Sequence, residues 1–152
     1  MSVFVRETLL DAPVQRVWDF HAGPDALARL SPPGGEVRIE SFHPVEEGRQ
    51  VVLSVRLAPL PLRVRWVARY ERVDPPHRFV DVALSSPFPR WEHHHLFIDV
   101  GGRCLARDEV HYDVPLGAVG ALLGGPFVEA ALRRQFDHRH RVLVSMFGAA
   151  PA

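Results

Sequence analysis

The side chains best suited to chemistry are concentrated in residues 90–97, which read RWEHHHLF. An extended strand is expected here, and neighbouring side chains of a strand point to opposite faces. His93 and His95 then share one face with two aromatic residues, whereas His94 lies on the other face. Imidazole groups exchange protons near neutral pH and bind metal ions, so this segment is the first candidate for a functional site.

The next segment supplies carboxylates for these histidines. If Gly101 and Gly102 form a two-residue hairpin turn, residue 100 pairs with residue 103. That register places Asp108 opposite His95, with their Cβ atoms roughly 4.5–5.5 Å apart. The same register predicts four more opposed pairs: His93 with Val110, Trp91 with Tyr112, Glu92 with His111, and His94 with Glu109.

The two faces of this hairpin are expected to differ in environment. The outer face would carry a solvated ladder of His94, His111, Glu92 and Glu109. The inner face would hold His93, His95 and Asp108, for which two interpretations stay open. They could be a buried polar group that anchors the head group of a ligand. Alternatively, His95 could act as a general base oriented by Asp108, with Tyr112 as proton donor.

Neither a metal ion nor a cofactor is predicted. As neighbours on one strand face, His93 and His95 supply only two ligands, although Asp108 could be a third. Cys104 is the single cysteine, which excludes a cysteine zinc cluster. The sequence contains no lysine for a Schiff base and no dinucleotide-binding glycine motif.

The remaining pattern predicts one α+β domain over residues 1–152. A strand at 3–10 precedes two short helices, the first starting near Pro13 and the second ending near Leu30. Strands with period-two alternation are expected at 36–43, 48–57, 62–74, 77–85, 90–100 and 103–114. They predict a curved seven-stranded antiparallel sheet around a long C-terminal helix at 127–147, interrupted before it by the glycines and proline at 124–126.

The inner face of this sheet and the apolar stripe of the terminal helix are expected to face each other. Arg139 lies in step with the apolar stripe of the helix, where a cation needs an acidic partner or a ligand anion. The candidate ligand-binding residues on these two inner surfaces are Trp66, Tyr70, Trp91, His93, His95, Phe97, Asp108, Val110, Tyr112, Val128, Leu132, Phe136 and Arg139.

Several stretches resemble one known superfamily. They are Ala12-Pro13 with Val17-Trp18, and segments 75–79 (PPHRF), 87–97, 108–115 and 139–141 (RHR). Together they are similar to the SRPBCC or START-like helix-grip proteins, in particular the bacterial polyketide cyclase/dehydrase-like branch. The resemblance implies a helix-grip fold with a hydrophobic cavity for a lipid, an isoprenoid or quinone, or a polyketide-like molecule.

Three functions are compatible with these observations, and the favoured prediction is a non-enzymatic carrier or sensor of a hydrophobic small molecule. The alternatives are a cyclase or dehydratase-type enzyme that uses the His95–Asp108 pair, and an interaction protein with a filled core. The charges balance at 18 Lys+Arg against 18 Asp+Glu, which argues against a nucleic-acid partner. No transmembrane segment or signal peptide is evident, so a cytoplasmic location is expected. An exposed sheet edge could pair two chains into a homodimer.

Overall fold

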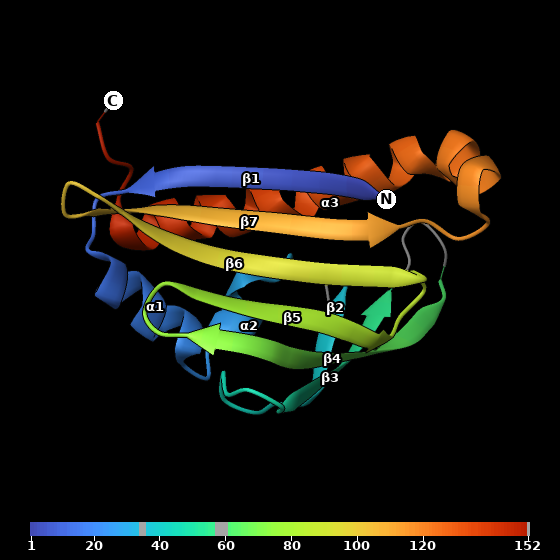
Figure 1. Cartoon of the computed structure of the whole chain (residues 1–152), viewed down its shortest axis with the longest axis horizontal. Helices are drawn as coiled ribbons and strands as arrows, with labels where there is room; N and C mark the ends of the chain where they lie inside the picture. Colours follow the sequence, from blue (N-terminus) through green and yellow to red (C-terminus); the bar gives the residue numbers. More distant parts are fainter. Residues whose placement is uncertain (34–35, 57–60, 152) are drawn as a thin grey trace.

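One antiparallel sheet forms the body of the protein in the computed structural model, which describes residues 1–33, 36–56 and 61–151 (Figure 1). Within this part of the chain the sheet has seven strands in the order β1-β7-β6-β5-β4-β3-β2. The strands are β1 (Ser2–Leu10), β2 (Val37–Ser41), β3 (Gln50–Arg56), β4 (Arg63–Asp74), β5 (Arg78–Ser85), β6 (Arg90–Val100) and β7 (Arg103–Asp113). The predicted order of elements along the chain and the antiparallel pairing are therefore confirmed, and the pairing of β1 with β7 adds to them. Residue 57 and most of the turn predicted after it lie outside the described residues.

The three helices of the described residues cover one face of the sheet (Figure 1). Helix α1 (Val14–Ala22) and helix α2 (Ala26–Leu30) follow β1, and the long α3 (Gly117–Phe147) lies behind the sheet along β1 and β7. Helix α1 begins after Pro13, whose missing N–H is no loss at a helix start. The arrangement is the predicted helix-grip fold.

The β6–β7 hairpin has the register that the sequence predicted. Gly101 and Gly102 both have positive φ angles, 59° and 84°, which glycine adopts without steric cost. Val100 pairs with Arg103, and His95 lies opposite Asp108. All the other predicted opposed pairs on both faces are also found. The turn therefore determines which side chains of β6 and β7 share the inner face.

The terminal helix differs from its prediction, because α3 starts at Gly117 and runs through Pro126 without ending. A proline inside a helix removes one backbone hydrogen bond and clashes with the preceding turn. The backbone hydrogen bonds before and after Pro126 keep the chain helical, so the interruption predicted at residues 124–126 is wrong. Figure 1 shows that the first turns of α3 bend away from the axis of the rest of the helix, as expected of a helix with an internal proline.

Apolar side chains form two separate clusters on the inner face of the sheet. The first cluster packs α1 and α2 against the sheet and the end of α3, and includes Trp18, Phe79, Phe97 and Leu143. The second lies further toward the start of α3. Its buried members are Val110, Tyr112, Leu132 and Phe136, and Phe4, Phe88, Trp91, Val114 and Val128 pack against them. The inner face is thus not one continuous apolar wall.

Candidate functional site

Buried polar side chains form a group that is called here the His–Asp cluster. One of its histidines packs against the first apolar cluster and another against the second. The cluster consists of Asp81 from β5, His93 and His95 from β6, Asp108 from β7, and Arg139 and His140 from α3. His95 stacks on Phe79 of the first cluster, and His93 contacts the edge of Phe136 in the second. Polar groups at such a depth require partners, and the hydrogen bonds within the cluster provide them.

Asp108 is the centre of the cluster because it accepts hydrogen bonds from three side chains. His93 Nε2 donates to Oδ1 at 2.7 Å, while Arg139 Nε and His140 Nε2 donate to Oδ2 at 3.0 and 2.8 Å. Desolvation by burial raises the pKa of the Asp108 carboxyl, but the charge of Arg139 and the bonds from His140 and His93 outweigh it. The pKa is held well below its usual range, so Asp108 is a carboxylate.

His95 has both ring nitrogens occupied, and neither hydrogen bond is to Asp108. Nε2 donates to Asp81 Oδ2 at 2.7 Å, and Nδ1 accepts from Arg139 Nη2 at 3.1 Å. Because an arginine only donates, His95 is the neutral tautomer with its proton on Nε2. Burial, together with the nearby His93, lowers the pKa of His95 to about 3. The register prediction for His95 and Asp108 is right, but His93 rather than His95 is hydrogen-bonded to Asp108.

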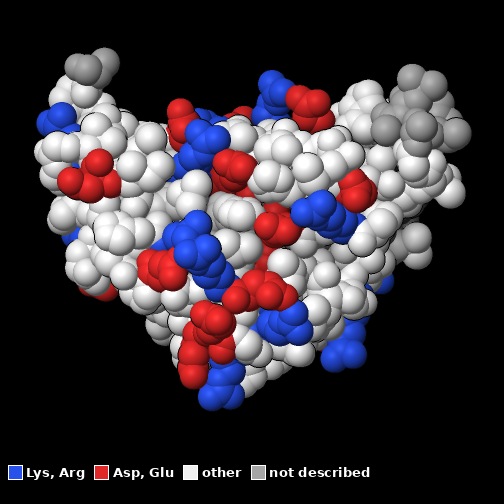
Figure 2. Space-filling model, in the orientation of Figure 1, with Lys and Arg blue, Asp and Glu red and all other residues white. Residues whose placement is uncertain are grey.

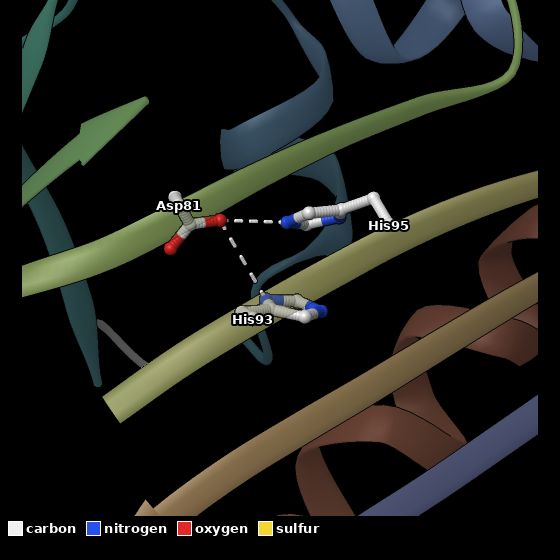
Figure 3. A group of neighbouring side chains, drawn as sticks. All are labelled: Asp81, His93 and His95. Atoms are coloured by element: carbon white, nitrogen blue, oxygen red, sulfur yellow. Dashed lines mark hydrogen bonds and ion pairs between the residues drawn. The ribbon is translucent and has the colours of Figure 1, made fainter. Parts of the chain in front are cut away.

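Asp81 is a member of this cluster that the sequence analysis did not identify. It pairs with His93 in the β5–β6 register, and its Oδ2 lies 3.8 Å from His93 Nδ1 (Figure 3). Burial raises the pKa of Asp81, but the bond from His95 and the charges around it leave the pKa below its ordinary value. The alternation along β5 was an available clue, because Asp81 shares its face with the buried Phe79.

His140 is a second member of the cluster that was not among the predicted site residues. Its Nε2 donates to Asp108, and its Nδ1 accepts from the Thr8 hydroxyl at 2.9 Å, so it ties α3 to both β1 and β7. Helical spacing could have found it, since residues 132, 136 and 140 are four apart and lie on one face. Arg139, by contrast, has the acidic partner that its place in the apolar stripe required.

The residues predicted to line one cavity are divided among three environments. Tyr70 and Phe97 belong to the first apolar cluster. The polar candidates His93, His95, Asp108 and Arg139 form part of the His–Asp cluster. The residues found in the second apolar cluster are Trp91, Val110, Tyr112, Val128, Leu132 and Phe136. Trp66 packs beside Trp91, with their ring centroids 5.0 Å apart.

Tyr112 is not brought next to His95. Tyr112 lies four residues beyond Asp108, the partner of His95 in the register, on the same face of β7. At about 3.3 Å per residue, that is a separation of about 13 Å along the strand. A general base and a proton donor that act on one reacting centre must both lie within hydrogen-bonding distance of it. The predicted trio of His95, Asp108 and Tyr112 is therefore not a single convergent site.

Among the hollows that the described residues form, two lie along α3, and neither of these is lined by the His–Asp cluster. The larger, of about 670 Å³, is called here the β1–β7–α3 hollow. Its lining residues are Ser2, Val3, Phe4, Val5, Tyr112, Val114, Gly125, Pro126, Glu129 and Arg133. Phe4, Tyr112 and Val114 also belong to the second apolar cluster, so this cluster forms the inner wall of the hollow.

The outer face of the sheet is covered by mixed charges, as Figure 2 shows for the view of Figure 1. His94 and His111 lie opposite Glu109 and Glu92, as predicted. Their hydrogen bonds, however, run along each strand, from His94 to Glu92 and from His111 to Glu109, both at 2.6 Å. The predicted ladder is present, with its strongest contacts between second neighbours on the same strand.

The fold, and the solved structures that superpose on it, define this chain as a helix-grip protein. Among solved structures, the ZhuI aromatase/cyclase from Streptomyces sp. R1128 superposes with a TM-score of 0.72 at 16% identity, covering 95% of this chain and 92% of that one. Norcoclaurine synthase from Thalictrum flavum, in complex with dopamine and hydroxybenzaldehyde, gives 0.70 at 14% identity, over 95% and 87% of the chains. A nucleoside-diphosphate sugar epimerase from Corynebacterium glutamicum gives 0.70 at 25% identity, over 93% of this chain but 28% of that one.

Residues 10–138 match the family described as polyketide cyclase/dehydrase and lipid transport. The chain belongs to this family, which confirms the resemblance predicted from its motifs. No curated protein matches the sequence. In the described part of the chain, no helix is long and apolar enough to cross a membrane.

Proposed function

We propose that the protein binds a hydrophobic small molecule as a carrier or sensor. The β1–β7–α3 hollow carries this proposal, because its volume of about 670 Å³ falls within the usual range for small-molecule sites. Its inner wall consists of Phe4, Tyr112 and Val114, and the rest of the second apolar cluster lies behind them. The ligand class that fits such a wall is a lipid, an isoprenoid or quinone, or a polyketide-like compound, in keeping with the family.

Binding without catalysis is favoured by the occupancy of the His–Asp cluster. A general base needs a free lone pair directed at the substrate, whereas both nitrogens of His95 are engaged by Asp81 and Arg139. A pKa of about 3 also makes His95 a weak base at neutral pH. The cyclase or dehydratase alternative, with His95 as base, stays a prediction. So do the homodimer, the cytoplasmic location and the absence of a nucleic-acid partner.

The proposal is tested first by extraction. Untagged protein is purified, its native mass is measured, and an organic extract of the denatured protein is analysed by mass spectrometry. One retained hydrophobic compound supports the proposal, and its structure tells whether it has a carbonyl group on which a base could act. Protein that carries no compound and binds none of a panel of fluorescent fatty acids, quinones and aromatic polyketides would refute it.

A matched pair of variants locates the binding site. Glu129→Trp places an indole at the hollow from an exposed helix position, whereas Ala131→Trp adds the same ring at an exposed position outside both hollows. Affinity for the extracted compound should fall at least tenfold in the first variant and change less than twofold in the second. Equal losses would exclude this hollow. His95→Ala should change affinity only modestly, and a loss of turnover with retained affinity would favour the enzyme instead.

A further inference from the structure

Three side chains of the His–Asp cluster direct potential metal ligands at one point (Figure 3). They are Asp81 Oδ2, His93 Nδ1 and His95 Nε2, and these atoms all lie within 4.8 Å of one another. Asp81 Oδ2 is 2.7 Å from His95 Nε2 and 3.8 Å from His93 Nδ1. Two neighbouring strands hold all three, because Asp81 pairs with His93 and His95 lies two residues further along the same face.

One ring nitrogen of His93 is hydrogen-bonded within the described chain and the other is not. His93 Nε2 is hydrogen-bonded to Asp108 Oδ1 at 2.7 Å. His93 Nδ1 faces the Asp81 carboxylate across 3.8 Å, which is too long for a hydrogen bond. A metal ion between these two groups would bind to both.

We propose that Asp81, His93 and His95 bind one divalent first-row transition metal ion through these three atoms. Two imidazole nitrogens and one carboxylate oxygen suit Zn²⁺, Fe²⁺ or Co²⁺. Metal–ligand bonds of about 2.0–2.2 Å require the ligand atoms to lie about 3.3 Å apart in tetrahedral geometry. The 2.7 Å contact must therefore open and the 3.8 Å contact close, each by about half an ångström.

Binding at His95 requires the other tautomer of this ring. The proton leaves Nε2 and is carried by Nδ1, for which Asp108 Oδ1, 3.4 Å away, is the nearest carboxylate acceptor. Arg139 gives up its bond to Nδ1 and keeps the one to Asp108 Oδ2. Asp108 would then accept a hydrogen bond from each of the two histidines, at the ring nitrogen that does not bind the metal. Carboxylates orient metal-bound imidazoles in this way in other proteins. From the sequence no metal is predicted, with Asp108 left as the possible third ligand, because only the β5–β6 pairing brings Asp81 beside His93 and His95.

The experiment measures metal binding by untagged protein stripped with a chelator. Zn²⁺ is titrated by calorimetry into the wild type, into Asp81→Asn, and into a control carrying His94→Gln and His111→Gln on the outer face. We expect one Zn²⁺ per chain, affinity at least tenfold lower in Asp81→Asn, and less than a twofold change in the control. Loss of binding in the control with retention in Asp81→Asn would assign the metal to the surface and overturn the proposal.

A second measurement does not depend on how well the variant folds. Co²⁺ added to the wild type should give a ligand-field absorption spectrum and shift the ring resonances of His93 and His95 strongly, while those of His94 and His111 move little. The reverse pattern of shifts, or no binding of Zn²⁺ or Co²⁺ at all, contradicts the site. The proposed function is judged separately, since retention of a hydrophobic compound neither requires nor excludes the metal.

Discussion

Asp108 is the residue on which most of the buried polar structure depends. Its carboxylate accepts from His93, Arg139 and His140, which belong to β6 and α3, so one side chain joins three elements. Removing one partner of a buried ion pair leaves the others with uncompensated charge and unmade hydrogen bonds.

Asp108→Asn should therefore lower the free energy of unfolding by about 3–5 kcal/mol. The amide keeps the size of the side chain but cannot accept all three donors, and it leaves the charge of Arg139 unpaired. Urea unfolding followed by circular dichroism measures the change. Glu109→Gln is the control, because it breaks partly exposed ion pairs on the outer face and should cost less than about 1 kcal/mol. Equal losses in both variants would contradict the central role of Asp108.

His21 should make the protein sensitive to acid. Burial, followed by the charge of Arg139, lowers the pKa of His21 to about 3, against 6.5 for an ordinary histidine. Between pH 6.5 and 3 the unfolded chain binds a proton at this residue that the folded protein does not. The free energy of unfolding therefore falls as the pH falls through this window, by about 1.4 kcal/mol per pH unit for this group.

The comparison variant is His21→Leu, which removes the titration but keeps an apolar contact with Phe97. Urea unfolding at pH 7, 6, 5 and 4 should show a slope against pH shallower than that of the wild type by about 1.4 kcal/mol per pH unit. Exposed His77 provides the control, since His77→Gln should leave the slope unchanged. A His21→Leu slope that equals the wild-type slope would show that His21 is not buried and neutral.

At the scale of elements, the β6–β7 hairpin positions the His–Asp cluster. A register shift by one residue would turn over the side chains of one strand relative to the other, so His93 and His95 would no longer share a face with Asp108. The positive φ angles of Gly101 and Gly102 match a two-residue turn of the type that prefers Asn-Gly. A Cβ at either position would meet nothing within 4 Å, so a substitution there tests conformation and not packing.

Gly101→Ala should cost about 1 kcal/mol of unfolding free energy, because alanine disfavours positive φ. Gly101→Asn should be close to neutral, since asparagine tolerates this conformation. Thermal or urea unfolding of the two variants measures the difference. A Gly101→Asn variant as unstable as Gly101→Ala would mean that the turn is not the one that sets this register.

At the scale of the whole molecule, the His–Asp cluster connects two apolar clusters that would otherwise be independent. Arg139 and His140 tie α3 to the centre of the sheet. Trp18 lies in the first cluster, and Trp91 packs against the second. The molecule thus has a fluorescent reporter in each half.

We expect both halves to unfold in one cooperative transition. Because Trp66 packs beside Trp91, the first half is followed in a Trp66→Phe/Trp91→Phe double variant and the second half in Trp18→Phe. In each, the fluorescence midpoint in urea should coincide with that measured by circular dichroism. When Asp108→Asn is added to these variants, the connection between the halves is weakened. The fluorescence midpoint of one half should then differ from that of the other half. Separate midpoints in the otherwise wild-type protein would show that the polar cluster does not couple the halves.

Local patterns were sufficient to predict the fold and part of the site. The alternation of β6 and β7, joined by Gly101 and Gly102, predicts which residues lie opposite each other, because strand geometry has a period of two and the turn determines the register. The apolar stripe of the terminal helix likewise predicts that Arg139, which lies in step with it, needs an acidic partner. It does not predict that α3 runs through Pro126, because that depends on the balance between one lost hydrogen bond and those that flank it.

The amino-acid sequence by itself thus determined the order of elements along the chain, the inward and outward faces of β6 and β7, and the family, whereas the pairing of β1 with β7 came from the structure. Only the tertiary structure decided that His95 bonds to Asp81 and Arg139, that His93 and His140 share Asp108, and that the predicted wall residues divide between two apolar clusters. The physical reason is that register places side chains opposite each other, whereas hydrogen bonds are chosen by rotamers among all donors within reach. The donors and acceptors from β5 and α3 come within reach only when the sheet curves around the helix.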